Sequence, residues 1–210
     1  MSRPILEFKL ATKRLLGTVT RTVRIDRIVD SRIVALADKE RLSTNFLVNK
    51  ALRRYVEWEA EAEHFGFVSI PNSIVGKTFD YLTAEQARDF GGWAGRNKIP
   101  EIVSFWFKKL DIENSLKALD LMGTQYGRAF RFEYSFDGRI YTLILKHDMG
   151  SKASAFYSEL VKSLFDMQGL RVETMETEDQ IVSKVYSSQG QGSSVSLSSS
   201  EQYETMIRAR

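Results

Sequence analysis

Cysteine is absent from the 210 residues of this sequence, and histidine occurs only twice, as His64 and His147. The lack of cysteine excludes disulfides, thiolate-bound metals, iron–sulfur clusters and a cysteine nucleophile. Two histidines without a cysteine also cannot supply a transition-metal site of several imidazoles and a thiolate. We therefore expect no bound metal and no other cofactor.

Long apolar runs are missing as well. None approaches the roughly 18–20 residues that a membrane-spanning helix needs, and charged residues interrupt residues 1–16, where a signal peptide would have its apolar core. The chain also lacks a glycine-rich dinucleotide fingerprint, a phosphate-binding loop, a nucleophile elbow and paired carboxylates at catalytic spacing. These absences predict a cytoplasmic protein that has no membrane partner, no catalytic residues and no enzymatic activity.

Positive charge is concentrated near the start of the sequence. Residues 1–58 hold 13 Lys and Arg against 6 Asp and Glu, and residues 59–210 hold 17 against 21, so the whole chain carries only +3. A basic segment ahead of an acidic remainder suggests a polyanion-binding module joined to a part with another role.

Residues 18–26, TVTRTVRID, alternate polar and apolar side chains and predict a β-strand. Because no other strand pattern occurs before residue 130, this strand would pair with the same strand of a second copy. Alternation places Val23 and Ile25 on the side that faces the following helices. The opposite side then carries three polar residues, Thr20, Thr22 and Arg24. A two-stranded ribbon of this kind fits the major groove of DNA, where Arg and Thr can read base edges.

Two helices are expected after this strand. Apolar residues at helical spacing, among them Val29 and Ile33, predict the first helix from Asp26 to about Arg41. Ser43 suits the N-cap of the second helix, which continues until Gly66 can end it in a left-handed conformation.

Residues 19–58, a strand, a helix, a tight turn ending in Ser-Thr and a second helix, resemble a ribbon-helix-helix DNA-binding domain of the CopG, Arc and MetJ kind. The resemblance implies a homodimer or higher homo-oligomer that binds double-stranded DNA. The implied base-reading residues are Thr20, Thr22 and Arg24. The implied phosphate contacts are Ser43, Thr44 and Asn45 at the start of the second helix, where N–H groups and the helix dipole attract an anion, and Arg21.

Two positions depart from the family pattern. Arg41 stands where the turn usually carries glycine, so it requires a left-handed conformation or a rearranged turn. Arg21 occupies a position that is often apolar, which places the start of the ribbon at Thr20.

Three other interpretations remain open. The segment can be an ordinary edge strand followed by a helical hairpin with solvated arginines. The chain can be an antitoxin-type DNA-binding protein whose C-terminal part binds a partner protein, although antitoxin tails are commonly short and fold on binding. An enzyme that uses His147 and Asp148 lacks a third catalytic group. The long foldable sequence beyond residue 58 favours a sequence-specific transcriptional regulator.

Several local signals divide the rest of the chain. Thr83 with Gln86 predicts a capping box for a helix that Gly91-Gly92 would end. Pro100 and Asp111 begin two more helices, the second reaching about Gly127. Residues 127–186 then predict two strands joined by a turn at Asp137-Gly138, a helix over 151–168 and two further strands.

The expected fold class is α+β, with an N-terminal ribbon-helix-helix dimerisation domain followed by a helical connector and a small antiparallel ββαββ domain. The expected boundaries are 1–16 for a basic N-terminal arm, 17–65 for the ribbon-helix-helix domain, 66–126 for the connector, 127–186 for the sensor or oligomerisation domain and 187–210 for a disordered serine-rich tail.

The junction between the hairpin and its helix, LKHDMGSKAS, is the remaining candidate site. It resembles a junction in archaeal ribbon-helix-helix proteins. This resemblance does not identify a ligand. The residues that would hold a small-molecule effector or an anion are His147, Asp148, Ser151 and Lys152. The competing interpretation is structural, with Asp148 or Ser151 as the N-cap of the helix and His147 as a polar residue at a strand end.

Overall fold

The structure is a computed structural model that describes residues 19–187. Within these residues the chain forms two compact units, residues 19–49 and residues 50–187. Helices and one four-stranded antiparallel sheet make the fold α+β, as predicted. None of the helices in this range has both the length and the apolar character that crossing a bilayer requires. The expected N-terminal arm, and the expected tail after Ser187, lie outside the described residues.

The unit of residues 19–49 contains helix α2 (Arg27–Glu40) and the first part of helix α3 (Thr44–Arg54). Asp26 begins α2 by accepting a hydrogen bond from a backbone N–H of the first turn. Arg41 ends α2 with φ 56° and ψ 41°, so of the two arrangements expected for this turn the structure has the left-handed conformation. Both helix boundaries therefore follow from local signals.

Helix α3 continues directly into a π-helical turn, η1 (Tyr55–Glu59), and then into α4 (Ala60–Phe65). Gly66 ends this helical run with φ 81°, which confirms the predicted left-handed stop. A non-helical connector of residues 67–71 leads to α5 (Asn72–Asp80).

Helix α6 (Ala84–Trp93) begins with the predicted capping box. Thr83 and Gln86 each accept a backbone N–H of the other, at 3.1 and 2.8 Å. The helical run then continues through a π-helical turn, η2 (Ala94–Lys98), into α7 (Ile99–Phe107).

The prediction that Gly91 and Gly92 end α6 is wrong. A Cβ added to Gly91 would lie 2.1 Å from the carbonyl oxygen of Phe156, which belongs to helix α9 (Ser151–Asp166). A Cβ on Gly95 would similarly lie 2.3 Å from the carbonyl oxygen of Leu160. The glycines therefore permit close packing of two helices, and this packing outweighs the roughly 1 kcal/mol that glycine costs inside a helix.

Helix α8 (Ile112–Asp120) starts at Asp111, as predicted, because its Oδ1 accepts the N–H of Asn114 at 2.9 Å. The helical run ends in a third π-helical turn, η3 (Leu121–Gln125). The hydroxyl of Thr124 then accepts the N–H of Phe132 at 2.7 Å and so ties η3 to the first strand of the sheet.

The sheet consists of two antiparallel hairpins placed side by side. The strands are β1 (Arg131–Phe136), β2 (Ile140–Lys146), β3 (Arg171–Glu176) and β4 (Gln180–Tyr186). Their order is β1-β2-β4-β3, so the inner strands β2 and β4 join the hairpins. The first hairpin turns at Asp137-Gly138, as predicted, with Gly138 at φ 96°.

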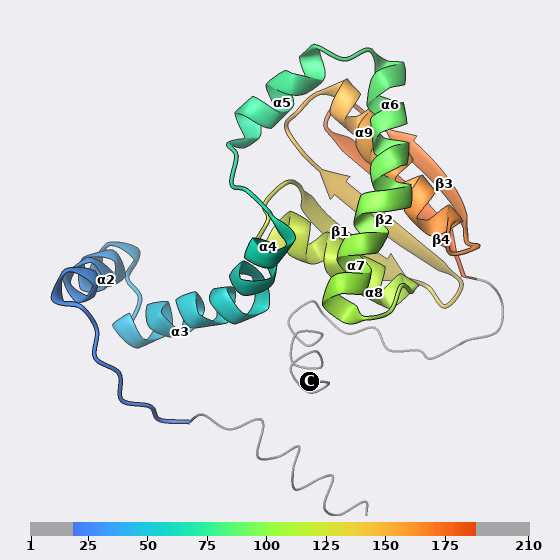
Figure 1. The fold of residues 1–210 in the computed structure, drawn as a ribbon. Helices are drawn as coiled ribbons and strands as arrows, with labels where there is room; N and C mark the ends of the chain where they lie inside the picture. Colours follow the sequence, from blue (N-terminus) through green and yellow to red (C-terminus); the bar gives the residue numbers. More distant parts are fainter. Residues whose placement is uncertain (1–18, 188–210) are drawn as a thin grey trace, which may run out of the picture. The chain divides into compact units, whose positions relative to one another are not determined.

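Helix α9 connects the two hairpins and packs between the sheet and α6 (Figure 1). Its Leu164 and Phe165 are fully buried, together with Leu143 and Ile181 of the sheet. Burying a side chain of this size contributes about 1.5–3 kcal/mol. The predicted ββαββ arrangement is therefore confirmed, and helix α9 is central to its core.

The segment expected to be a separate helical connector, residues 66–126, belongs to the same compact unit as the sheet. Helix α6 packs along α9, and α8 contacts both α7 and β1. This unit begins at Lys50, inside α3. The sequence instead predicts a domain boundary after residue 65. The helical run after Lys50 packs within this unit, where Trp58 lies against Trp106 with ring centroids 5.3 Å apart.

Candidate nucleic-acid interface and an apolar pocket

Residues 19–26, the predicted ribbon, form neither helix nor strand with the rest of the described chain. The side chains expected to contact DNA here are all exposed: Thr20, Arg21, Thr22 and Arg24. Val23 and Ile25, expected to face a core, are exposed as well. A β-strand needs a hydrogen-bonding partner strand, and residues 19–26 have none within the described chain. Their pairing with a second copy therefore stays a prediction.

Large apolar side chains remain exposed throughout the unit of residues 19–49. They are Val19, Val23, Ile25, Ile28, Val29, Val34, Leu36, Leu42 and Phe46. Among the described residues of this unit, only Ala37 is buried. One copy of the segment therefore encloses no hydrophobic core of its own.

The N-terminus of α3 has the geometry expected of an anion site. Ser43 Oγ accepts the N–H of Phe46 at 3.1 Å, which confirms Ser43 as the N-cap. Within the described chain, the N–H groups of Thr44 and Asn45 donate to no acceptor, and the first turn contains no acidic residue. Two donors and the positive end of the helix dipole therefore face outward at this turn.

At the hairpin–helix junction, both ring nitrogens of His147 are engaged within the protein. Nδ1 accepts the N–H of Met149 at 3.3 Å, and Nε2 lies 3.0 Å from the hydroxyl of Ser154. Since Nδ1 is an acceptor, the neutral ring carries its proton on Nε2 and donates it to Ser154. The Ser154 hydroxyl donates in turn to the carbonyl of Glu178 at 3.3 Å. These bonds join the end of β2 to α9 and to the β3–β4 turn.

The other residues of the predicted effector site do not converge on His147. Asp148 and Ser151 are exposed, and Lys152 donates through Nζ to the backbone carbonyl of Asp80 at 3.0 Å. Gly150, at φ 80°, precedes α9 and no side chain caps this helix. The structural interpretation that Asp148 or Ser151 is the cap is therefore wrong.

Burial lowers the pKa of His147, and the nearby charges of Asp179 and Asp148 only partly oppose this effect. The ring is therefore neutral near pH 7 and suits its hydrogen-bonding role better than binding of an anion. Within the described residues, no group of three or more His, Cys, Asp or Glu side chains is placed to hold a metal ion.

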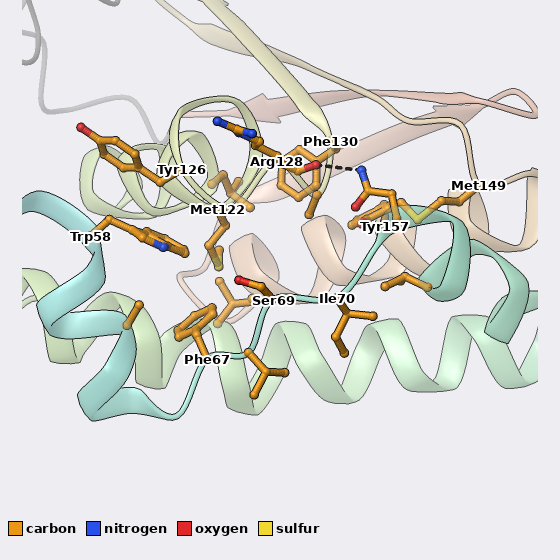
Figure 2. A pocket seen from close by; sticks show the side chains of 18 of the residues that line it. Trp58, Phe67, Ser69, Ile70, Met122, Tyr126, Arg128, Phe130, Met149 and Tyr157 are labelled. Atoms are coloured by element: carbon orange, nitrogen blue, oxygen red, sulfur yellow. Dashed lines mark hydrogen bonds between the residues drawn. The ribbon is translucent and has the colours of Figure 1, made fainter. Parts of the chain in front are cut away.

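A pocket of about 900 Å³ lies within the unit of residues 50–187 (Figure 2). One wall comes from the helical run that contains Trp58, and a second from the connector of residues 67–70. The segment from Met122 to Phe130 and residues of α9 form further walls, and single residues of other elements add to the lining: Asn72, Val75, Ile99, Leu119 and Met149. A volume of this size is in the range that holds a drug-sized ligand.

Aromatic side chains dominate both ends of the pocket. At one end Trp58 packs against Phe67 and Trp106, with ring centroids 5.2 and 5.3 Å away. At the other end the rings of Phe130 and Tyr157 meet edge to face at 5.1 Å. Figure 2 shows Trp58 and Tyr126 towards one end of the space and Met149 and Tyr157 towards the other.

The charged residues that line the pocket balance one another. Arg54 pairs with Glu59 at 2.7 Å, and Arg128 and Glu63 contribute one charge of each sign. Asn72 fixes the backbone next to Arg128 by donating to its carbonyl at 3.0 Å. The pocket therefore has no net charge that would select an ion.

Sequence reasoning did not identify this pocket. Its aromatic residues lie between positions 58 and 157 and follow no local motif. The only sequence signal was the presence of aromatic residues in the segment expected to be a connector. Trp106, which packs against Trp58 at one end of the pocket, is only 4% exposed.

No known family model matches the chain, and no curated protein shows significant similarity to it. The resemblance to ribbon-helix-helix proteins therefore stays a prediction.

Proposed function

We propose that the chain is a sequence-specific DNA-binding transcriptional regulator that acts as a dimer or a multiple of it, with a two-stranded ribbon in the major groove. The observation that carries the proposal is the row of exposed apolar side chains in residues 19–46. Val23 and Ile25 alternate with Thr22 and Arg24, and Val23 is 66% exposed. Antiparallel pairing with a second copy would cover the apolar side of the segment and leave its polar side free.

The charge of the N-terminal part and the start of α3 support DNA as the partner. Residues 1–58 carry an excess of basic side chains, which attracts the phosphate backbone. The outward-facing N–H groups of Thr44 and Asn45 suit a phosphate oxygen. In this proposal Ser43, Thr44, Asn45 and Arg21 position the DNA, and the ribbon specifies the sequence.

The antitoxin-type alternative is less well supported. Antitoxin tails commonly fold only on their partner, whereas residues 50–187 enclose a core of their own around α9. A regulator with a separately folded second part accounts better for this organisation.

The decisive experiment selects bound DNA from a random pool and then measures affinity over single-base changes in the selected site. Arg24→Ala removes a side chain that can fork onto guanine, so it should flatten preference at one position of each half-site by about 1–3 kcal/mol. Arg21→Ala is the matched control, because it removes the same charge from the other strand face.

Two outcomes would contradict the proposal. If no sequence is enriched, the chain is not a sequence-specific DNA-binding protein. If Arg21→Ala loses the base preference and Arg24→Ala keeps it, the strand register is wrong by one residue.

A further inference from the structure

One wall of the pocket of residues 50–187 carries a tyrosine whose hydroxyl has no hydrogen-bond partner among the described residues. Tyr157 is only 6% exposed and lines the pocket. Its ring packs against Phe130, Phe156 and His147, but its hydroxyl makes no hydrogen bond with any described residue. The side chain is buried, but its hydroxyl is not among the fully enclosed atoms that lack a partner. The hydroxyl is therefore accessible from the pocket, and because tyrosine hydroxyls in largely buried positions usually have a partner, it is available to bond a ligand.

Two further observations define the chemistry of that ligand. The walls are mostly aromatic and aliphatic, and their charged residues balance, so an uncharged and largely apolar molecule fits best. Burial raises the pKa of Tyr157, so the hydroxyl stays protonated and acts as a donor. The matching group on the ligand is therefore an acceptor such as a carbonyl or ether oxygen.

We propose that this pocket binds an uncharged aromatic small molecule that accepts a hydrogen bond from the hydroxyl of Tyr157. Its rings would lie between the Trp58 end and the Phe130 end of the pocket. The site lies entirely within residues 50–187, so this inference goes beyond the proposed DNA binding and does not depend on it. It also differs from the site expected around His147, whose ring nitrogens are already engaged.

The proposal can be tested with Prodan, an uncharged naphthalene ketone whose fluorescence reports the polarity around its carbonyl. We expect saturable binding of one molecule per chain, with a blue shift and quenching of tryptophan emission. Tyr157→Phe removes only the hydroxyl, so it should weaken Prodan binding about threefold to tenfold. Binding of N-phenylnaphthylamine, which has no carbonyl acceptor, should not change.

Matched variants locate the site. Ser69 lines the middle of the pocket (Figure 2) and is exposed, so Ser69→Trp should fill the space and weaken Prodan binding at least about tenfold. Ser73→Trp places the same side chain at an exposed position outside the pocket and should leave the affinity unchanged. Tyr141→Phe serves as the hydroxyl control, because Tyr141 is half-buried in β2 and does not line the pocket.

Several outcomes would overturn the proposal. Absence of saturable Prodan binding to the full chain would exclude the site, as would equal effects of Ser69→Trp and Ser73→Trp. If Ser69→Trp does not fold, Tyr157→Phe still tests the proposal. Equal Prodan affinity of the original protein and Tyr157→Phe would show that the hydroxyl does not bind the ligand. Tighter binding of the anionic dye anilinonaphthalene sulfonate than of Prodan would show that the ligand class is wrong.

Discussion

The two histidines of the chain have contrasting surroundings. His147 is half-buried and bonded through both ring nitrogens, whereas His64 is exposed and its Nδ1 lies 2.9 Å from the carbonyl of Ala60 in its own helix. Protonating His147 would replace the acceptor at Nδ1 by a donor directed at the N–H of Met149. The charged form is therefore disfavoured in the folded protein.

This difference predicts a pH dependence of stability. The pKa of His147 is lower in the folded protein than the usual 6.5, so the unfolded chain binds more protons below that value. The contribution of His147 is therefore fully present above about pH 6.5 and is lost as the pH falls towards its folded pKa. We expect the free energy of unfolding, from urea titrations between pH 7 and 5, to fall less steeply with decreasing pH in His147→Gln than in the original protein.

His64→Gln provides the control for this measurement, because it makes the same substitution at an exposed histidine away from the His147 site. A profile that changes with His64→Gln and not with His147→Gln would contradict the assigned hydrogen bonds.

At the scale of secondary-structure elements, the close crossing of α6 and α9 depends on single glycines. Gly91→Ala would place a Cβ 2.1 Å from the carbonyl oxygen of Phe156, a backbone atom that cannot move by itself. We expect a loss of stability of about 1–3 kcal/mol or more, measured by thermal or urea unfolding.

The adjacent Gly92 is a matched control. The nearest atoms to a Cβ there belong to the guanidinium of Arg96, at 3.0 Å, which is the far end of a flexible side chain. Because alanine is favoured over glycine in a helix by roughly 1 kcal/mol, Gly92→Ala should be close to neutral. Equal destabilisation by both substitutions would show that the effect does not come from the contact of Gly91 with Phe156.

The start of α3 has both a structural and a proposed functional role. Ser43→Ala removes the bond to the N–H of Phe46, which should cost about 1 kcal/mol of stability. If the same turn holds a phosphate, affinity should fall about equally across DNA sequences. Binding titrations on the selected site and on unrelated DNA, at several salt concentrations, separate the two effects.

Ser31→Ala is the control, because Ser31 lies inside α2 and its hydroxyl only donates to the carbonyl of Ile28. It should preserve both stability and DNA affinity. A change of sequence preference in Ser43→Ala without a general loss of affinity would contradict the assigned division of roles.

At the scale of the whole molecule, the exposed apolar side chains of residues 19–46 predict self-association. Light scattering should give twice the chain mass of 24.1 kDa, or a multiple of that. Val23→Lys places a charge on the side that pairing would bury, so it should shift the protein towards a monomer at micromolar concentration. Thr22→Lys carries the same charge on the outer side and should remain dimeric.

The fold of residues 50–187 should survive Val23→Lys, since its core does not involve Val23. Circular dichroism can verify this in the same samples. A wild-type protein that is monomeric and fully folded, or equal behaviour of the two lysine variants, would contradict the ribbon.

Local signals in the sequence determined most element boundaries of this protein. Asp26, Ser43 and Asp111 begin helices, and Gly66 ends one, where the sequence predicts. Caps and turns are formed by residues two to four positions apart, so their energies are already present in the local sequence. Alternation and the Asp137-Gly138 turn likewise predicted the first hairpin of the sheet.

Only the tertiary structure decided the role of Gly91, the bonding of His147 and the existence of the pocket. Each depends on groups distant in the chain: Gly91 faces Phe156, and Trp58 shares a pocket with Tyr157. Such contacts form when helices and strands pack together and bury apolar surface. Many sequences with similar periodicity can bury apolar surface equally well, so periodicity does not specify the individual contacts. A local pattern therefore shows that a side chain is apolar or polar, whereas packing determines which side chains meet and whether a polar group such as the Tyr157 hydroxyl is left without a partner.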